Sequence, residues 1–148
     1  MATTPEGKVK DAARKLYQKH GAKYDRAVAN GMGQNGRADD IVCRGGDGHF
    51  GGVEFKKLDV WRVTALQRIW LTDTADRGGS AMVVNETNLG MLERWLQRPG
   101  TRVIAEFDGD VCVRHWAFVP GCPPHEIKNP ALPGKAGKHR AGVSPSRL

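Results

Sequence analysis

Three segments of the chain place apolar residues at helical spacing and are bounded by helix start and stop signals. They are residues 3–21, 64–77 and 88–97. The first opens on Thr-Thr-Pro-Glu and the second on a threonine suited to an N-cap, while glycine follows at the end of each segment. The inward stripe predicted for the second segment is Leu66, Ile69 and Trp70. The pattern therefore predicts three amphipathic helices.

Short strand-like runs alternate with these helices. They cover residues 24–30, 41–44, 49–57, 81–84, 102–107 and 111–119. The last two flank an Asp-Gly-Asp turn and so predict a hairpin, whereas residues 31–36 (GMGQNG) predict a flexible connection. This order of elements is typical of an α/β fold in which helices flank a mixed sheet.

The runs 41–44 and 49–57 flank a Gly-rich turn and predict one tight hairpin. Pairing residues symmetrically about that turn sets Arg44 opposite His49 and Asp39 opposite Glu54, with Cβ atoms about 4.5–5.5 Å apart. Lys56 then lies on the same face as Glu54, about 6.6 Å further along the strand. Two carboxylates and an ammonium group converge, which suits a divalent cation and a water that attacks a phosphate.

Each member of this cluster has a chemical role in that hypothesis. Asp39 and Glu54 can each offer an oxygen to Mg²⁺, and the backbone carbonyl of Phe55 is a further candidate ligand. Lys56 would orient the attacking water and stabilise negative charge developing on the phosphorus. The opposite face of the two strands carries Val42, Val53 and Phe55, which we expect in the core. Asp40 points to that face too and is assigned a structural role.

The bulk composition indicates one folded domain and an anionic partner. The chain has 148 residues, of which 39% are hydrophobic, and a net charge of +7. That balance favours a polyanion, and nucleic acid is the commonest one. We expect no membrane span and a cytoplasmic location, because the sequence shows neither a long apolar run nor a signal-peptide core. Three widely spaced cysteines fit a reducing compartment.

Composition changes after residue 120, where prolines and glycines mix with basic residues. We therefore predict a folded domain over residues 1–120 and a basic, mostly disordered tail over residues 121–148. Two Cys-x-x-His pairs near this boundary leave a zinc-stabilised interaction domain as an alternative. The first pair, Cys112 and His115, is an odd number of residues apart on a predicted strand, so its members should face opposite ways.

The sequence GRAD at residues 36–39 is followed by VEFK at 53–56, TALQ at 64–67 and GGSA at 78–81. In this order the segments resemble the PD-(D/E)xK nuclease superfamily, most closely small phage and bacterial VRR-NUC and Holliday-junction-resolvase-like members. Their pattern is G-x-P-D, a short hairpin, E-x-K and a helix with Gln in its first turn. The resemblance covers about residues 6–84, and Ala38 stands where the family usually has Pro.

This resemblance implies a restriction-endonuclease-like fold and a metal-dependent endodeoxyribonuclease. Asp39, Glu54 and Lys56 would be catalytic and Gln67 supporting, while Glu6 stands where many members place a helical acid near the metal. The implied cofactor is Mg²⁺, for which Mn²⁺ is expected to substitute.

Several alternatives stay open on the sequence alone. Asp39 could be a turn acid, Glu54 and Lys56 an exposed ion pair, Glu6 a helix-dipole cap and Gln67 a solvated residue. The core could also serve a sequence-specific or homing-type endonuclease, or a nucleic-acid-binding module without catalysis.

The predicted partner is DNA, with branched DNA such as a Holliday junction as the expected substrate. Lys57, Arg62 and Lys23 flank the predicted site and are candidate phosphate contacts. Branched substrates and double-strand cuts need two active sites, so a homodimer is expected.

Overall fold

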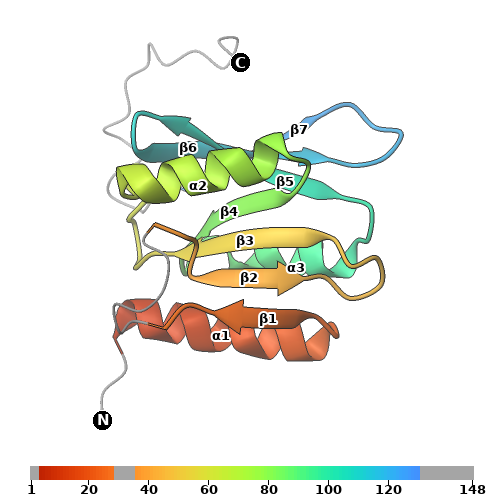
Figure 1. Cartoon of the computed structure of the whole chain (residues 1–148), viewed down its shortest axis with the longest axis horizontal. Helices are drawn as coiled ribbons and strands as arrows, with labels where there is room; N and C mark the ends of the chain where they lie inside the picture. Colours follow the sequence, from red (N-terminus) through yellow and green to blue (C-terminus); the bar gives the residue numbers. More distant parts are fainter. Residues whose placement is uncertain (1–3, 29–35, 131–148) are drawn as a thin grey trace.

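Seven strands form one mixed sheet within residues 4–28 and 36–130, the part of the chain that the computed structural model describes (Figure 1). Strands that are neighbours in the chain are also neighbours in the sheet, so the order runs from β1 to β7. The strands are β1 Lys23–Arg26, β2 Asp40–Cys43, β3 Phe50–Phe55, β4 Ser80–Val84, β5 Arg102–Asp108, β6 Val111–Phe118 and β7 His125–Lys128. The central strands β3, β4 and β5 run parallel, and the outer pairs are antiparallel.

Helices cover both faces of this sheet. The helices α1 (Pro5–Lys19) and α3 (Leu89–Gln97) pack on one face, and α2 (Ala65–Asp76) packs on the other (Figure 1). Each face has its own apolar core. Residues of α1, α3 and the strands β2 to β4 form the larger core, including Val42, Val53 and Phe55 as predicted. The α/β fold with a mixed sheet and flanking helices is thus confirmed. No described helix has the length and apolar character that crossing a membrane requires.

The first two helices begin where the sequence predicts. The hydroxyl of Thr4 accepts a hydrogen bond from the Gly7 backbone N–H at 3.0 Å, and Pro5 follows at the first helical position. Thr64 and Gln67 form a reciprocal capping box at the start of α2. The third helix follows Asn88, which caps it without a side-chain hydrogen bond to the helix.

The inward face of α2 differs from the predicted stripe. Leu66 and Ile69 are 56% and 54% exposed, and the helix buries Leu71 and Ala75 instead. Trp70 is half-buried over Gly52, where a Cβ atom would collide with its ring. The prediction was wrong because it placed every large apolar residue inward. In the first turns of α2, the positions that face the sheet are occupied by half-buried polar residues, among them Gln67 and Arg68.

The C-terminal region is more ordered than predicted. Residues 125–128 of the expected tail form β7, which pairs with β6 from Arg114↔Lys128 to Ala117↔His125. An ion pair of 3.0 Å between Arg114 and Glu126 supports this pairing. An edge strand with one covered face needs only alternate apolar residues. The sequence HEIK can therefore form such a strand although its apolar content is too low to indicate one. Residues 131–148 lie outside the described part of the chain.

The start of the sheet is described only in part. Within the predicted strand 24–30, the structure shows β1 ending at Arg26, and residues 29–35 lie outside the described ranges. The predicted flexible connection at 31–36 therefore falls almost wholly outside them.

Candidate active site

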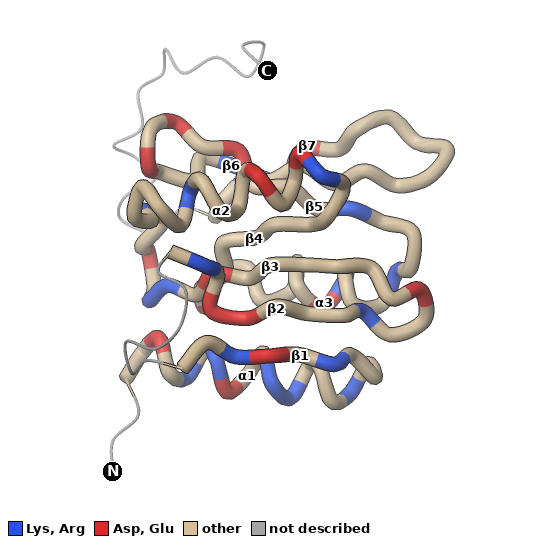
Figure 2. Tube along the Cα trace, in the orientation of Figure 1, with Lys and Arg blue, Asp and Glu red and all other residues tan. Residues whose placement is uncertain are grey.

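The β2–β3 hairpin has the predicted register. Asp40 pairs with Val53 and Cys43 pairs with Phe50, so the next position outward sets Asp39 opposite Glu54. The backbone N–H of Phe55 donates to Asp39 Oδ2 at 2.8 Å, which fixes the Asp39 carboxylate against the end of β3. The tube in Figure 2 shows acidic and basic positions meeting at this end of the two strands. The hairpin therefore brings the two acids together, as expected from the turn.

Glu54 is a buried carboxylate with incomplete hydrogen bonding. It is 2% exposed, and its Oε1 atom has no hydrogen-bond partner among the described residues. Burial raises the pKa of Glu54 to about 8, with the charge of Asp39 adding to the rise and Lys56 opposing it. A strand residue with these properties is costly to the fold, which makes it a candidate for function.

Lys56 and Gln67 meet at the edge of this site. The Lys56 ammonium lies 3.4 Å from Glu54 Oε2 and 3.3 Å from Gln67 Oε1. The same Gln67 oxygen accepts a hydrogen bond of 2.9 Å from the Thr64 backbone N–H. Gln67 is thus fixed by the helix start and in turn holds Lys56 near Glu54. The structure brings together Asp39, Glu54, Lys56 and Gln67.

Glu6 approaches the cluster only through a lysine. Lys10 Nζ lies 3.4 Å from Glu6 Oε2 and 3.6 Å from Asp39 Oδ1. The i,i+4 spacing of Glu6 and Lys10 in α1 is a sequence signal for this pair, but nothing in the sequence places Lys10 beside Asp39. A metal-ligand role for Glu6 stays a prediction.

Asp40 anchors the neighbouring part of the site from the other face. Its carboxylate is fully buried and accepts hydrogen bonds from Tyr17 Oη at 2.9 Å and from Arg26 Nε and Nη2 at 2.8 and 2.9 Å. Arg26 also donates to the Lys10 carbonyl at 3.2 Å. Burial, followed by the charge of Asp40, raises the pKa of Tyr17 far above its ordinary value. The structural role expected of Asp40 is confirmed, while no sequence pattern placed Tyr17 or Arg26 beside it.

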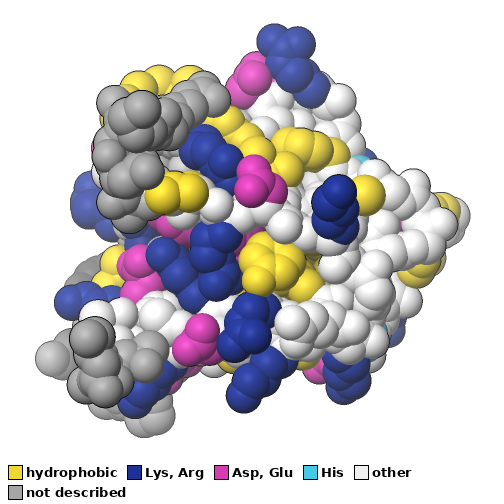
Figure 3. Space-filling model, turned by 60° about the horizontal axis from the view of Figure 1, so that its bottom comes forward, with side chains coloured by type: hydrophobic (Ala, Val, Ile, Leu, Met, Phe, Trp, Pro, Cys, Tyr) yellow, Lys and Arg dark blue, Asp and Glu magenta, His cyan; other side chains and the backbone are white. Residues whose placement is uncertain are grey.

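The three candidate phosphate contacts do not lie together. Lys57 is exposed and directly follows Lys56 at the end of β3. Arg62 is also exposed, but it forms a bridge with Val111 of β6, which is three strands away from β3 in the sheet. Lys23 is exposed too, but it pairs with Cys43, at the end of β1 remote from Asp40. That offset of three residues corresponds to about 10 Å. Lys23 therefore does not flank the cluster as predicted, because β1 runs antiparallel to β2. In Figure 3, basic side chains with acidic ones among them occupy the side to which α1 and β1 contribute.

Cys112 and His115 share a face, contrary to the strand periodicity. A register shift between Glu106 and Phe107 leaves one extra residue in β6, which turns the two side chains to the same side. Cys112 Sγ lies 3.9 Å from His115 Nε2, and that nitrogen accepts a hydrogen bond of 3.1 Å from the Val83 backbone N–H. Burial lowers the pKa of His115 to about 4. The neutral imidazole thus joins β6 to β4 inside the sheet.

The Asp39–Glu54 pair has the donor chemistry that a small divalent cation takes. Glu54 Oε1, which has no hydrogen-bond partner among the described residues, is the kind of buried atom that a cation would satisfy, and Mg²⁺ commonly takes only one or two protein carboxylates. No cluster of three or more His, Cys, Asp or Glu side chains suited to a metal occurs in the ranges that the structure describes. The side chains available to a metal here are therefore these two carboxylates.

Comparisons with models of protein families, with characterised proteins and with solved structures found no match for this chain. The resemblance to PD-(D/E)xK nucleases consequently depends on the sequence segments and on the geometry described above.

Proposed function

We propose that this protein is a Mg²⁺-dependent endodeoxyribonuclease with a restriction-endonuclease-like fold, selective for branched DNA such as a Holliday junction. The observation that carries the proposal is the convergence of Asp39, Glu54 and Lys56, in which one buried carboxylate oxygen of Glu54 has no hydrogen-bond partner in the described part of the chain. An exposed ion pair on a strand would not require that burial. Phosphodiester hydrolysis requires acids for a cation and a positive group beside them, and this cluster supplies both.

The residues of the cluster have distinct roles in this reaction. Asp39 and Glu54 would hold the cation, with Asp39 oriented by the Phe55 N–H. A bound Mg²⁺ supplies charge neutralisation and a water of lowered pKa. The Lys56 ammonium stabilises the negative charge that grows on the phosphate, and Gln67 keeps Lys56 at the edge of the site. Ca²⁺, which is larger and more loosely coordinated, should support DNA binding with little hydrolysis.

Exposed cations supply the DNA contacts in the proposal. Lys57 directly follows Lys56 and would contact a phosphate beside the cluster, and Arg62 would contact the DNA backbone further along, near the start of β6. Contacts of this kind with phosphates do not depend on the base sequence. Because the described residues of one chain form one such cluster, cutting both strands of a junction requires a homodimer.

The test uses supercoiled plasmid, linear duplex and a synthetic four-way junction, each incubated with full-length protein and Mg²⁺ or Mn²⁺. We expect the junction to be cut fastest, and Asp39→Ala or Lys56→Ala to lower the rate by at least about 100-fold. The exposed Asp76→Asn is the matched control and should cut normally. Cutting that survives Asp39→Ala would exclude this site. Binding without cleavage would favour a non-catalytic module, and cutting at one sequence in linear DNA would favour a sequence-specific endonuclease.

A further inference from the structure

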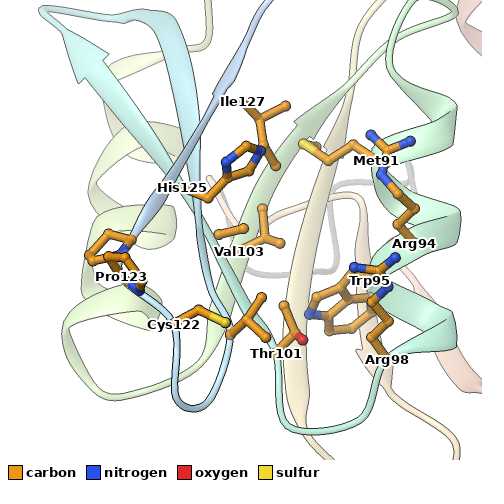
Figure 4. A pocket seen from close by; sticks show the side chains of 13 residues that line it. Met91, Arg94, Trp95, Arg98, Thr101, Val103, Cys122, Pro123, His125 and Ile127 are labelled. Carbon is orange, nitrogen blue, oxygen red and sulfur yellow. The ribbon is translucent and has the colours of Figure 1, made fainter.

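An open cavity lies on the face of the sheet opposite α2, between α3 and the strands β5 to β7 (Figure 4). Its volume is about 650 Å³. The floor is apolar and consists of Met91, Trp95, Val103, Ala117, Val119 and Ile127. Side chains of α3 form one wall of the cavity, opposite the segment that leads into β7 (Figure 4). None of the candidate active-site residues lines it.

The rim of the cavity carries positive charge without compensation. Arg94 is an exposed residue in the last turn of α3, and the exposed Arg98 caps the C-terminus of this helix, so the two residues lie about 6 Å apart along its axis. In Figure 4 both side chains stand beside Trp95, across the cavity from His125. Neither guanidinium group has a hydrogen bond or an ion pair with any residue in the described ranges, and no acidic residue lines the cavity. Two free arginines at this spacing can converge on one anionic group.

The far lip of the cavity is formed before any ligand arrives. The Cys122 backbone N–H donates to the Val119 carbonyl at 3.0 Å, closing a turn in which Gly121 has a φ of 79°. Pro123 and Pro124 follow and restrict the backbone further. A ligand therefore need not order this segment, which lowers the cost of binding.

We propose that this cavity binds a small apolar acid, a molecule with a hydrocarbon or aromatic body and a single carboxylate or phosphate group. The volume lies in the range of small-molecule sites, which combine apolar walls with a few charged groups. The body would lie against Met91, Val103 and Ile127, and the acid group would bind Arg94 and Arg98. Residues 131–148 contain basic but no acidic side chains, so their charge disfavours them as the occupant. The inference does not depend on the proposed nuclease activity.

Titration calorimetry on the full-length protein, below the micelle concentration of each probe, tests this site. The probes are decanoate, decyl phosphate and the uncharged decan-1-ol. We expect saturable binding of at least one of the two acids at one site per chain, about 10-fold or more tighter than decan-1-ol. Comparing decanoate with decyl phosphate shows which acid group the arginines prefer.

The Arg94→Gln/Arg98→Gln double variant should weaken binding of the acid by about 10- to 100-fold, because each charge-assisted hydrogen bond contributes strongly. Binding of decan-1-ol should not change. Arg77→Gln, which alters an exposed arginine on the opposite helix, is the matched control and should bind like the parent. Both sites of the double variant are exposed, so thermal unfolding should show an intact fold. Absence of saturable acid binding, equal binding of decan-1-ol, or an unaffected double variant would each overturn the proposal.

Discussion

The carboxyl group of Glu54 lies inside the sheet, and one of its oxygens is reached by no described hydrogen-bond donor. Its pKa in the folded chain, about 8, is above the ordinary value of 4.5. Below pH 4.5 the group is neutral in both the folded and the unfolded chain. As the pH rises from there towards 8, the unfolded chain loses this proton while the folded chain retains it, so Glu54 progressively destabilises the fold.

We predict that Glu54→Gln stabilises the metal-free protein at alkaline pH. A pKa difference of one corresponds to about 1.4 kcal/mol, and the pKa of about 8 already includes the attraction to Lys56, so we expect a gain on the order of 4 kcal/mol at pH 9 and close to zero at pH 4. Urea unfolding at several pH values in EDTA measures the difference. The exposed Glu86→Gln is the control and should show no such trend. A Glu54→Gln protein that is less stable at pH 9 would contradict the buried, uncompensated charge.

The sequence predicts the central residues of the site because they depend on local symmetry. Once the glycine-rich turn is placed, the pairing of β2 with β3 follows, and with it the position of Asp39 opposite Glu54. Lys10 and Arg26 could not be found in the same way. Their contacts with Asp39 and Asp40 arise from the packing of α1 against the sheet, which no local pattern determines.

At the scale of elements, Asp40 joins α1, β1 and β2 through Tyr17 and Arg26. We predict that Asp40→Asn lowers the free energy of unfolding by about 3 kcal/mol, since it leaves a partly buried guanidinium group without its counter-charge. Tyr17→Phe should cost about 1 kcal/mol, the contribution of one hydrogen bond. Denaturant unfolding checks both values. Asp25→Asn alters an exposed acid of β1 and should change stability by less than about 0.5 kcal/mol.

The orientation of α2 gives a second prediction at this scale. Leu71→Ala should destabilise the protein by about 3 kcal/mol because it opens a cavity in the core on the α2 face. Leu66→Ala and Ile69→Ala should each cost less than about 0.5 kcal/mol, since both side chains are exposed. The urea midpoints of the three variants, at unchanged slope, measure this contrast. If Leu66→Ala destabilised the protein as much as Leu71→Ala, the result would support the inward stripe of Leu66, Ile69 and Trp70 that the sequence predicts.

The elements that the sequence misplaces share one cause. Periodicity identifies α1 and α3 because their apolar residues all serve the core, whereas α2 turns Gln67 towards the site and leaves Leu66 outside. The extra residue in β6 reverses the expected facing of Cys112 and His115 in the same manner. Predicting a buried face from the spacing of apolar residues assumes that the environment is uniform along the element. The environments of α2 and β6 are not uniform.

At the scale of the whole molecule, the net charge of +7 is not spread evenly around the candidate site. Lys57 adjoins it, whereas Arg62 lies against Val111 of β6 and the antiparallel course of β1 carries Lys23 to the far end of the sheet edge. A DNA backbone that approaches Asp39 and Glu54 would therefore meet Lys57 and not Lys23.

This arrangement predicts which variants change the salt dependence of DNA binding in EDTA, where hydrolysis does not interfere. Removing one cation that binds a phosphate should lower the slope of log K against log salt by about 0.9. Lys57→Gln should therefore reduce the slope by about 1, while Lys23→Gln, which removes the same type of charge, should leave it unchanged. Fluorescence anisotropy of a labelled four-way junction across a salt series measures the slopes of the parent and of both variants. A reduction for Lys23→Gln as well would mean that bound DNA extends along β1 to the far end of the sheet.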